Sequence, residues 1–406
     1  MLQTLETGVK GGKWFSLIDK VWKKDNLAAS WLKSLRNRGS AGVDGQSVQQ
    51  FTANLNTELD RLHGELRVGS YVPLPVRRCW IPKLGSKEKR PLGIPAVRDR
   101  IVQGAIRNVV EPIFERVFAE HSYGFRPGRG CKDALRRVDH LLNEGKNWVV
   151  DVDLKKYFDT IPHEKLMERV KELISDGKLL ALIESYLKAG VLEGLEGWEP
   201  TEQGTPQGAV ISPQLANLYL NPLDHEMAAK GYAMTRYADD FIVQCQSQAE
   251  AQTALELITQ WAQENGLTVH PTKTRIVDAT QKGGFDFLGY HFERGMKWPR
   301  QKSMDKLKET IRARTRRTEG HSMSEIIASI NPTLRGWFAY FKHSMPNTFT
   351  ATDGWIRMRL RSILRQNEGK RGRGRGNDQI KWTNAFFEQL GYFSLEKAHA
   401  AALQSQ

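Results

Sequence analysis

Two adjacent carboxylates lie between two short runs of residues that favour β-strands. Tyr237-Ala238-Asp239-Asp240 stands inside a stretch that begins at Met234 and ends at Val243. Strand formers on both sides predict a β-hairpin that carries two acidic groups at its tip, rather than a solvated surface turn. The fold must therefore hold charged groups at the end of a largely buried sheet.

A second acidic strand end lies upstream, in the stretch from Val149 to Asp159. Asp151 and Asp153 share one face of this strand because side chains alternate, so alternation alone does not choose between them. Together with Asp239 and Asp240, a carboxylate from this strand gives three acids on two strands. Three such carboxylates can hold two divalent cations for an in-line phosphoryl displacement.

Composition points to a polyanionic partner. The chain has 406 residues, of which 40% are hydrophobic and 26% charged, as in ordinary globular proteins, and we expect two to four structural units. Its 60 Lys and Arg residues outnumber 46 acidic ones, for a formal net charge of +14. Nucleic acid is the first candidate partner. An anionic membrane surface is the alternative, but no strongly amphipathic terminal helix supports it.

Cysteine usage and the N-terminus predict a cytoplasmic protein. Cys79, Cys131 and Cys245 are isolated and form neither a CxxC pair nor a zinc-like spacing. The first seven residues lack the pattern of a signal peptide, and no run of about 18 apolar residues predicts a membrane span. We expect no membrane partner.

The order of the predicted elements indicates an α+β fold. Its central part predicts a β-α-β-β-α-β order, that of a ferredoxin-like sheet. The other predicted elements are mainly helical, with a basic hairpin near residues 71–95 and a Gly/Arg linker with a short aromatic tail at the end. Helices are predicted at 14–22, 48–66, 97–119, 163–188, 212–229, 249–265, 303–317 and 324–365, and strands at 149–153, 232–236, 241–245, 274–278 and 285–291.

Several blocks, in order, resemble those of group II intron-encoded reverse transcriptases. The Tyr237–Asp240 stretch is similar to the signature of reverse transcriptases, and Asp153–Asp159 resembles their first acidic motif. Motifs in family order cover residues 40 to 395. The other resembling blocks are Gly42–Gly45, Arg90–Pro95, Ser122–Arg129, Gly204–Pro213, Phe287–Tyr290 (the primer-grip block) and Ile330–Phe341 (the maturase, or thumb, block).

The resemblance implies a right-hand polymerase with fingers, a ferredoxin-like palm and a helical thumb. The implied regions are an N-terminal extension with the start of the fingers (1–88), the reverse transcriptase fingers and palm (89–295), the thumb or maturase domain (296–368), and a basic linker with a short tail (369–406). The implied type lacks a C-terminal HNH endonuclease.

The resemblance also implies a metal site. Asp153 and Asp239 would bind two Mg²⁺ ions, for which Mn²⁺ is a possible substitute. Asp240 would help to bind or align the ions, and the backbone carbonyl of Leu154 would complete one coordination shell.

Seven residues match family positions near the incoming dNTP. Lys83 and Arg90 would grip the triphosphate, with a solvated charged hairpin as the alternative. Phe158 would be a steric gate against a ribose 2′-hydroxyl, with core packing as its alternative. The remaining implied roles are nucleotide contact for Gln207, close backbone approach for Gly208, room at the primer end for Ala238, and protonation of pyrophosphate for Lys273.

Basic residues are the expected contacts to template and primer. Arg126 and Arg129 surround a Pro-Gly turn and would contact phosphate, with local structural pairing as the alternative. Arginines spaced by two and four residues over 357–365 would spread positive charge across a helix surface, and the segment 370–376 would be a flexible linker that follows RNA. The predicted nucleic-acid-binding residues are Arg126, Arg129, Gly289, Lys306, Arg312, Arg316, Arg357 and Arg361.

The expected function is RNA-directed DNA synthesis for a group II intron, with maturase activity that assists splicing and mobility. The expected partners are an RNA template, a DNA primer, dNTPs, intron RNA and target DNA. The alternatives are a domesticated reverse transcriptase in DNA repair or phage defence, and a basic RNA-binding protein with an inactive palm. The oligomeric state is not predicted.

Overall fold

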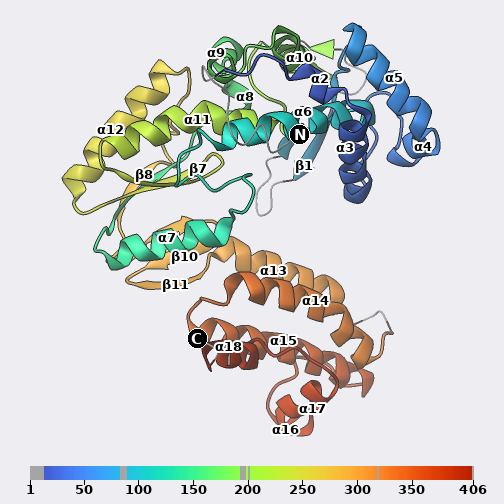
Figure 1. Ribbon diagram of the computed structural model, residues 1–406. Coiled ribbons are helices and arrows are strands. Elements are labelled where there is room, and N and C mark those ends of the chain that lie inside the picture. Colours follow the sequence, from blue (N-terminus) through green and yellow to red (C-terminus); the bar gives the residue numbers. More distant parts are fainter. Residues whose placement is uncertain (1–12, 83–88, 193–197, 200–201, 318–319, 405–406) are drawn as a thin grey trace. The chain divides into compact units, whose positions relative to one another are not determined.

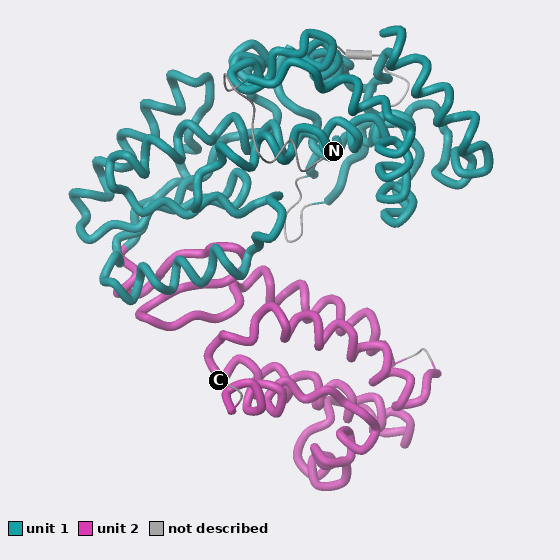
Figure 2. The backbone as a smooth tube through the Cα atoms, in the orientation of Figure 1, with its two compact units in different colours: residues 1–277 teal, residues 278–406 magenta. Residues whose placement is uncertain are grey.

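The computed structural model of the chain describes residues 13–82, 89–192, 198–199, 202–317 and 320–404. The chain divides into two compact units, residues 1–277 and 278–406 (Figure 2). The finer division into four regions remains a prediction. Among the described residues, no helix is long and apolar enough to cross a membrane.

Helices make up the N-terminal part of the first unit, and two of the predicted ones are interrupted. The helix expected at 14–22 is a single turn, because Lys23 is extended and starts a new helix. The helix expected at 48–66 is divided at Asn54. These helices are α2 (Ile18–Val21), α3 (Lys24–Asn37), α4 (Val48–Ala53), α5 (Leu55–Val68) and α6 (Val97–Glu115).

A basic hairpin forms where the sequence predicts it. Strands β1 (Val76–Pro82) and β2 (Lys89–Ile94) pair antiparallel. Two short strands, β4 (Val191–Leu192) and β5 (Trp198–Glu199), extend this sheet in the order β2-β1-β4-β5.

The second sheet has the ferredoxin-like order that the sequence predicts. Its strands are β3 (Trp148–Val152), β6 (Ala233–Tyr237), β7 (Asp240–Cys245) and β8 (Arg275–Asp278), arranged β6-β7-β3-β8. Helices α11 (Ser212–Ala229) and α12 (Gln248–Glu264) lie along one side of it (Figure 1). Helix α7 (Cys131–Asn143) contacts β6 and β7.

The helix predicted at 163–188 is two helices, α9 (His163–Leu173) and α10 (Gly177–Lys188), and Asp176 explains the break. One oxygen of its carboxylate caps α10 by accepting hydrogen bonds from the backbone N–H groups of Lys178 and Leu179. The other oxygen accepts from the N–H groups of Leu17 and Ile18 at 2.7 and 2.8 Å. This buried carboxylate therefore starts the second helix and fixes the N-terminal turn.

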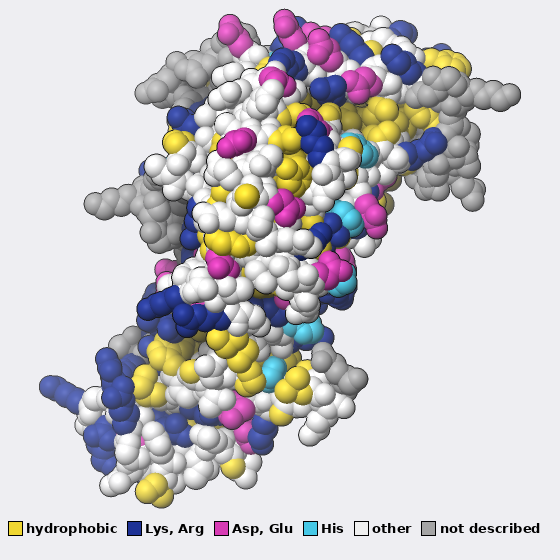
Figure 3. All heavy atoms as spheres, turned by 90° about the vertical axis from the view of Figure 1, so that its left-hand side faces the viewer, with side chains coloured by type: hydrophobic (Ala, Val, Ile, Leu, Met, Phe, Trp, Pro, Cys, Tyr) yellow, Lys and Arg dark blue, Asp and Glu magenta, His cyan; other side chains and the backbone are white. Residues whose placement is uncertain are grey.

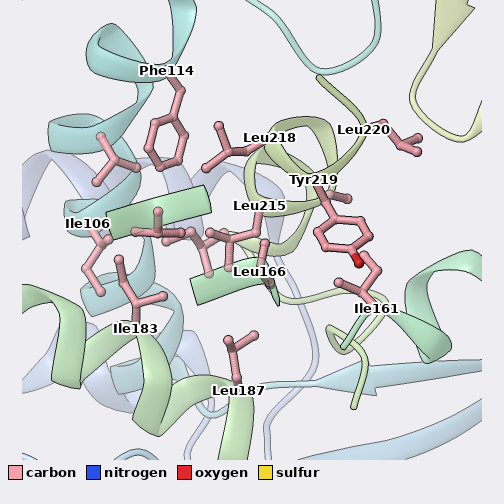
Figure 4. Close-up of a cluster of buried hydrophobic side chains, with 14 of the residues drawn as sticks. Ile106, Phe114, Ile161, Leu166, Ile183, Leu187, Leu215, Leu218, Tyr219 and Leu220 are labelled. Atoms are coloured by element: carbon pink, nitrogen blue, oxygen red, sulfur yellow. The ribbon is translucent and has the colours of Figure 1, made fainter. Parts of the chain in front are cut away.

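The core of this unit lies between its helices and the sheet β6-β7-β3-β8. In Figure 4, Ile106 and Phe114 of α6 face Leu215 and Leu218 of α11, and all four side chains are buried. Close packing on this scale holds α11, and the short helix α8 (Tyr157–Thr160), under the acidic strand ends.

The second unit begins with a three-stranded sheet and continues as helices. The strand predicted at 285–291 bends at Leu288 and Gly289, which have positive φ, so it becomes β9 (Phe285–Phe287) and β10 (Tyr290–Glu293) beside β11 (Met296–Pro299).

Helix α13 (Gln301–Arg314) follows the sheet of the second unit. The long helix predicted at 324–365 is α14 (Met323–Phe341) and α15 (Pro346–Asn367), since Pro346 favours a first helical turn. The tail holds α16 (Asn377–Lys381), α17 (Asn384–Gln389) and α18 (Leu395–Gln404). Its side chains Trp382, Phe387, Tyr392 and Leu395 join the core of this unit, so the tail folds back onto it.

Candidate active site

Strand register brings the two acidic segments to the same edge of the sheet. In the antiparallel pair β3–β7, Val152 lies opposite Phe241. Asp153 follows Val152 and Asp240 precedes Phe241, so both acids lie at the same end of the sheet. The β6–β7 hairpin turns at Ala238 and Asp239, with Tyr237 opposite Asp240.

The turn itself has a strained backbone. Ala238 has a φ of 60°, in the left-handed region that residues with a side chain seldom adopt. Gly124 packs directly against it, because a Cβ added there would lie 2.3 Å from the Ala238 nitrogen. An unusual conformation of this kind persists only where the surrounding structure enforces it.

Arg236 supplies much of that enforcement, and sequence reasoning missed it. Its guanidinium is fully buried and donates to both oxygens of Asp224 on α11, with Nε to Oδ1 at 2.8 Å. Nη1 donates to Asn217 Oδ1 and to the carbonyl oxygen of Ala238, both at 2.9 Å. A signal was available, since an arginine inside an apolar strand, two residues before the turn, needs a buried partner.

Burial and a like charge act on Asp239. Burial is the main reason why the pKa of Asp239 is raised, and the nearby negative charge of Asp153 raises it further. The positive charge of Arg90, on β2, opposes this rise in pKa. Arg90 and Asp153 therefore both lie within electrostatic reach of the turn.

The other acidic strand end is clamped by the turn that precedes β8. The backbone N–H of Asp153 donates to Thr274 Oγ1 at 3.2 Å, and its carbonyl accepts from the N–H of His270 at 2.7 Å. The Lys273 ammonium lies 3.4 Å from Asp153 Oδ2. Asp151, which the sequence left as a competitor, instead pairs with Arg275 at 3.3 Å.

The carboxylates of Asp153 and Asp239 suit a divalent cation whose other ligands come from a substrate. Asp153 and Asp239 repel one another, and a cation between them would relieve that repulsion. Among the described residues, no group of three or more His, Cys, Asp or Glu side chains could by itself hold a metal ion. One or two carboxylates completed by substrate phosphates is the usual arrangement for Mg²⁺.

A loop before α11 carries the predicted nucleotide contacts. The carbonyl of Gln207 accepts from the N–H of Gly93 at 2.7 Å, which ties this loop to β2. Gly208 has a φ of 108°, and a Cβ there would lie 2.5 Å from the Gly93 carbonyl oxygen. The close approach that glycine permits here is thus to the hairpin backbone.

Two further predicted nucleotide contacts, Phe158 and Lys83, and the predicted metal ligand Leu154 lie in different settings. Phe158 is half-buried against the core, with its ring 5.4 Å from that of Tyr157. Leu154 is buried and forms a bridge with Val269. Lys83 lies outside the described residues.

Of the two arginines near the Pro-Gly turn, Arg126 corrects the expectation of a phosphate contact. Its guanidinium is buried, donates to both Glu115 oxygens, and also donates to the carbonyls of Ala119 and Ser122. Arg126 therefore has the alternative role, local structural pairing. Arg129 is half-buried and donates to the carbonyl of Glu120.

Two predicted nucleic-acid contacts on α15 are also corrected. Arg357 is buried beside Asp353, and Arg361 is buried where it donates to the Trp382 carbonyl and to Asn384 Oδ1. Both arginines hold the C-terminal unit together, because the tail folds back over this side of α15. The spacing of these arginines in the sequence could not show that the tail covers them.

Three predicted contacts do lie on the surface of the C-terminal unit. Lys306, Arg312 and Arg316 are exposed, and Lys and Arg side chains gather over this unit in the lower part of Figure 3. Gly289 has a φ of 89° between β9 and β10, and its carbonyl accepts from Ser303 Oγ at 3.1 Å.

Comparisons with known proteins agree with this geometry. The family model described as reverse transcriptase (RNA-dependent DNA polymerase) matches residues 81–292, more than half of the chain. The model for the group II intron, maturase-specific domain matches residues 304–381.

Two curated relatives and one solved structure illustrate the similarity. Protein YkfC of Escherichia coli (strain K12) is 36% identical over 320 residues, which cover 68% of this chain and 83% of that protein. The group II intron-encoded protein LtrA of Lactococcus lactis subsp. cremoris is 43% identical over 193 residues, 48% of this chain and 31% of LtrA. The partial Cas6-RT-Cas1--Cas2 complex contains a chain with 26% identity and a TM-score of 0.40, with 61% of this chain and 41% of that chain covered.

The acidic hairpin, its sheet and the family match define a reverse transcriptase, and the chain belongs to that family. More particularly, it joins a reverse transcriptase domain to a group II intron maturase-specific domain. The prediction of an RNA-directed DNA polymerase with a maturase role is confirmed, and the domesticated alternative is not favoured. Divalent metal ions and nucleic acids are the family's general cofactors and partners.

Proposed function

We propose that Asp153 and Asp239 are the metal-binding carboxylates of this polymerase, with Asp240 beside them, and that the ions are two Mg²⁺. The proposal rests mainly on the β3–β7 register, which sets Asp153 next to the turn that carries Asp239 and Asp240. When bound, such ions lower the pKa of a primer 3′-hydroxyl and stabilise a leaving pyrophosphate.

The chain's own residues prepare this site in three ways. Arg236 holds the Ala238 carbonyl and so fixes the direction in which Asp239 projects. Arg90 brings positive charge to the place where a triphosphate would lie. Fixed groups of this kind spend no free energy on reorganisation during the reaction.

Lys273 is the proposed proton donor to the leaving group. Its ammonium lies 3.4 Å from Asp153 Oδ2, so it stands beside the metal-binding carboxylate, and its side chain is 58% exposed. An ammonium there can reach a phosphate oxygen and release a proton to it.

Lys83, Gln207 and Phe158 remain proposed contacts to the incoming nucleotide, as do Leu154 for the metal and Ala238 for the primer end. Gln207 is well placed for this because its backbone is tied to β2, which also carries Arg90.

Intron RNA is the proposed partner of the C-terminal unit. The maturase-specific match spans residues 304–381, a segment that carries the exposed cations Lys306, Arg312 and Arg316. Each phosphate that they neutralise would add salt-dependent affinity.

Two assays test whether the acidic residues serve DNA synthesis and not the assistance to splicing. The double variant Asp239→Ala, Asp240→Ala should abolish dTMP incorporation on poly(rA)/oligo(dT) with Mg²⁺, while assistance to intron splicing persists. Asp25→Ala, an exposed acid on α3, is the matched control and should leave both activities unchanged. Full incorporation by the double variant would exclude the proposed metal site, and loss of splicing alone would reassign these acids to RNA binding.

A further inference from the structure

A cavity in the C-terminal unit has a strongly basic lining. Its volume is about 610 Å³, and its walls come from α13, α15 and the segment that joins α15 to α16. We call it the arginine pocket, and its lining includes Arg312, Arg317, Trp355, Arg359, Arg373 and Arg375.

One wall of the arginine pocket is pre-formed. Arg359 donates from Nε to Thr315 Oγ1 at 2.9 Å and from Nη2 to the Thr315 carbonyl at 3.0 Å, at the end of α13. Its guanidinium also lies 5.5 Å from the ring centroid of Trp355, and Arg312 lies 5.6 Å from the same ring. An aromatic ring and two cations are thus held side by side.

The positive charge in the pocket lacks an acidic counterpart. No described residue of the lining is Asp or Glu. Burial lowers the pKa of Arg359, and the neighbouring positive charges of Arg312 and Arg317 lower it further. Cations that repel one another around a cavity favour an anion inside it.

The segment that carries Arg373 and Arg375 is docked, which corrects the expectation of a merely flexible linker. The N–H of Gly374 donates to Ser362 Oγ on α15 at 2.9 Å. A Cβ at Gly374 would lie 2.4 Å from the Cβ of Arg361, so only glycine can approach this closely. The arginines on either side of Gly374 are exposed and both line the pocket.

We propose that the arginine pocket binds one unpaired nucleotide of an RNA strand, with the phosphates on its arginines and the base beside Trp355. The inference rests on the proposed intron RNA partner, because the whole lining falls inside the maturase-specific match. The size of the cavity suits a nucleotide rather than a duplex, whose rigid rod would meet only the rim. Arginine forks and an aromatic ring are the groups with which proteins hold single strands.

The test compares two double variants that remove equal charge. Arg373→Gln with Arg375→Gln changes the pocket, whereas Arg335→Gln with Arg371→Gln removes two exposed arginines outside its lining. The full-length protein is titrated with a fluorescent single-stranded RNA 12-mer, an RNA duplex with the same number of nucleotides, and a DNA 12-mer of the same sequence. Thermal unfolding shows that the variants are folded.

The pocket variant should lose about tenfold in affinity for single-stranded RNA. Its slope of log K against log salt should fall by about 1.4, since each phosphate contact on a single strand contributes about 0.7. The control variant should lose much less, and the two variants should affect the duplex equally. Equal losses on single-stranded RNA, a greater loss on the duplex, or the same pocket dependence for DNA would each overturn the proposal.

Incorporation of dTMP by the same proteins separates this inference from the proposed function. Wild-type incorporation together with an unchanged affinity of the pocket variant would contradict the pocket alone. Failure of the wild-type protein to incorporate dTMP would contradict the polymerase site, while the titrations would still decide the pocket.

Discussion

Arg236 of the first unit and the arginines of the pocket in the second unit have opposite surroundings. In the first unit, Arg236 is fully buried, and Asp224 neutralises it beside the acidic turn. In the second unit, the arginine pocket gathers five arginines without an acid among the described residues of its lining. The comparison indicates that the burial and partners of an arginine, rather than its place in a basic run, separate the arginines that position the chain from those that we propose bind a ligand.

The largest expected effect comes from breaking the buried pair of the first unit. Arg236→Gln leaves Asp224 charged and buried, which should lower the free energy of unfolding by about 3–5 kcal/mol. It also removes the donor to the Ala238 carbonyl. Urea unfolding and dTMP incorporation measure the two consequences.

A double variant separates stability from positioning. Arg236→Met with Asp224→Leu removes both charges, so most of the stability should return. The turn still lacks its donor, and kcat should therefore remain about a hundredfold low while KM changes little. Full recovery of kcat would show that Arg236 acts only through stability.

A buried carboxylate with a weaker arginine partner should make stability depend on pH. Asp99 accepts hydrogen bonds from Tyr71 and from the N–H of Leu74, but its nearest Arg98 nitrogen is 3.9 Å away. Burial raises the pKa of Asp99 from 3.8 to about 6. This raised pKa favours the folded state fully below about pH 3.8, and the advantage is lost as the pH rises through 6.

Asp99→Asn isolates that contribution. The free energy of unfolding of the wild-type protein, taken relative to the variant, should fall by about 2.4 kcal/mol between pH 4 and pH 7. Urea unfolding at several pH values measures it. A relative stability that is independent of pH would contradict the raised pKa.

A milder effect is expected at Arg357, a buried arginine of the second unit. Its closest approach to Asp353 is 3.7 Å, and Asp353 also accepts from Tyr392, Ser394 and two backbone N–H groups. Arg357→Gln should therefore cost only about 1 kcal/mol of stability, because Asp353 keeps its other donors. Affinity for single-stranded RNA should not change. A tenfold loss of affinity in the folded variant would place Arg357 among the ligand-binding arginines.

The smallest effect is expected at Gly374. The added Cβ of Gly374→Ala would press on Arg361 and lift the segment that carries Arg373 and Arg375. Affinity for single-stranded RNA should fall about threefold, while dTMP incorporation at saturating template is unchanged. Gly372→Ala is not a suitable control because its φ is 104°. Gly336→Ala on α14, outside the lining of the pocket, serves instead, because a Cβ there meets nothing within 4 Å.

The sequence predicted the ferredoxin-like sheet and the acidic hairpin because both depend on local pattern. Strand formers around Asp239 and Asp240 predict the hairpin, and the alternation of strands and helices predicts the strand order. Breaks inside long helices were missed, because Asp176, which starts α10, is fixed by hydrogen bonds from Leu17 and Ile18, far away in the sequence.

Burial of charged residues was the main information that the sequence withheld. Arg126, Arg236 and Arg361 find partners on other elements, and local spacing does not report such partners. The choice between Asp151 and Asp153 was likewise open, since alternation puts both on one face. In the structure only Asp153 stands past the end of β3, whereas Asp151 lies within the strand beside Arg275.

The choice between Asp151 and Asp153 also gives the most direct test of the acidic site. Incorporation of dTMP on poly(rA)/oligo(dT) is measured for Asp153→Asn and, as a matched control on the same strand face, for Asp151→Asn. We predict a loss of at least about a thousandfold for Asp153→Asn, because a metal-binding carboxylate contributes several kcal/mol to the transition state, and nearly normal activity for Asp151→Asn. Normal activity of Asp153→Asn, or inactivity of Asp151→Asn alone, would contradict the proposed site.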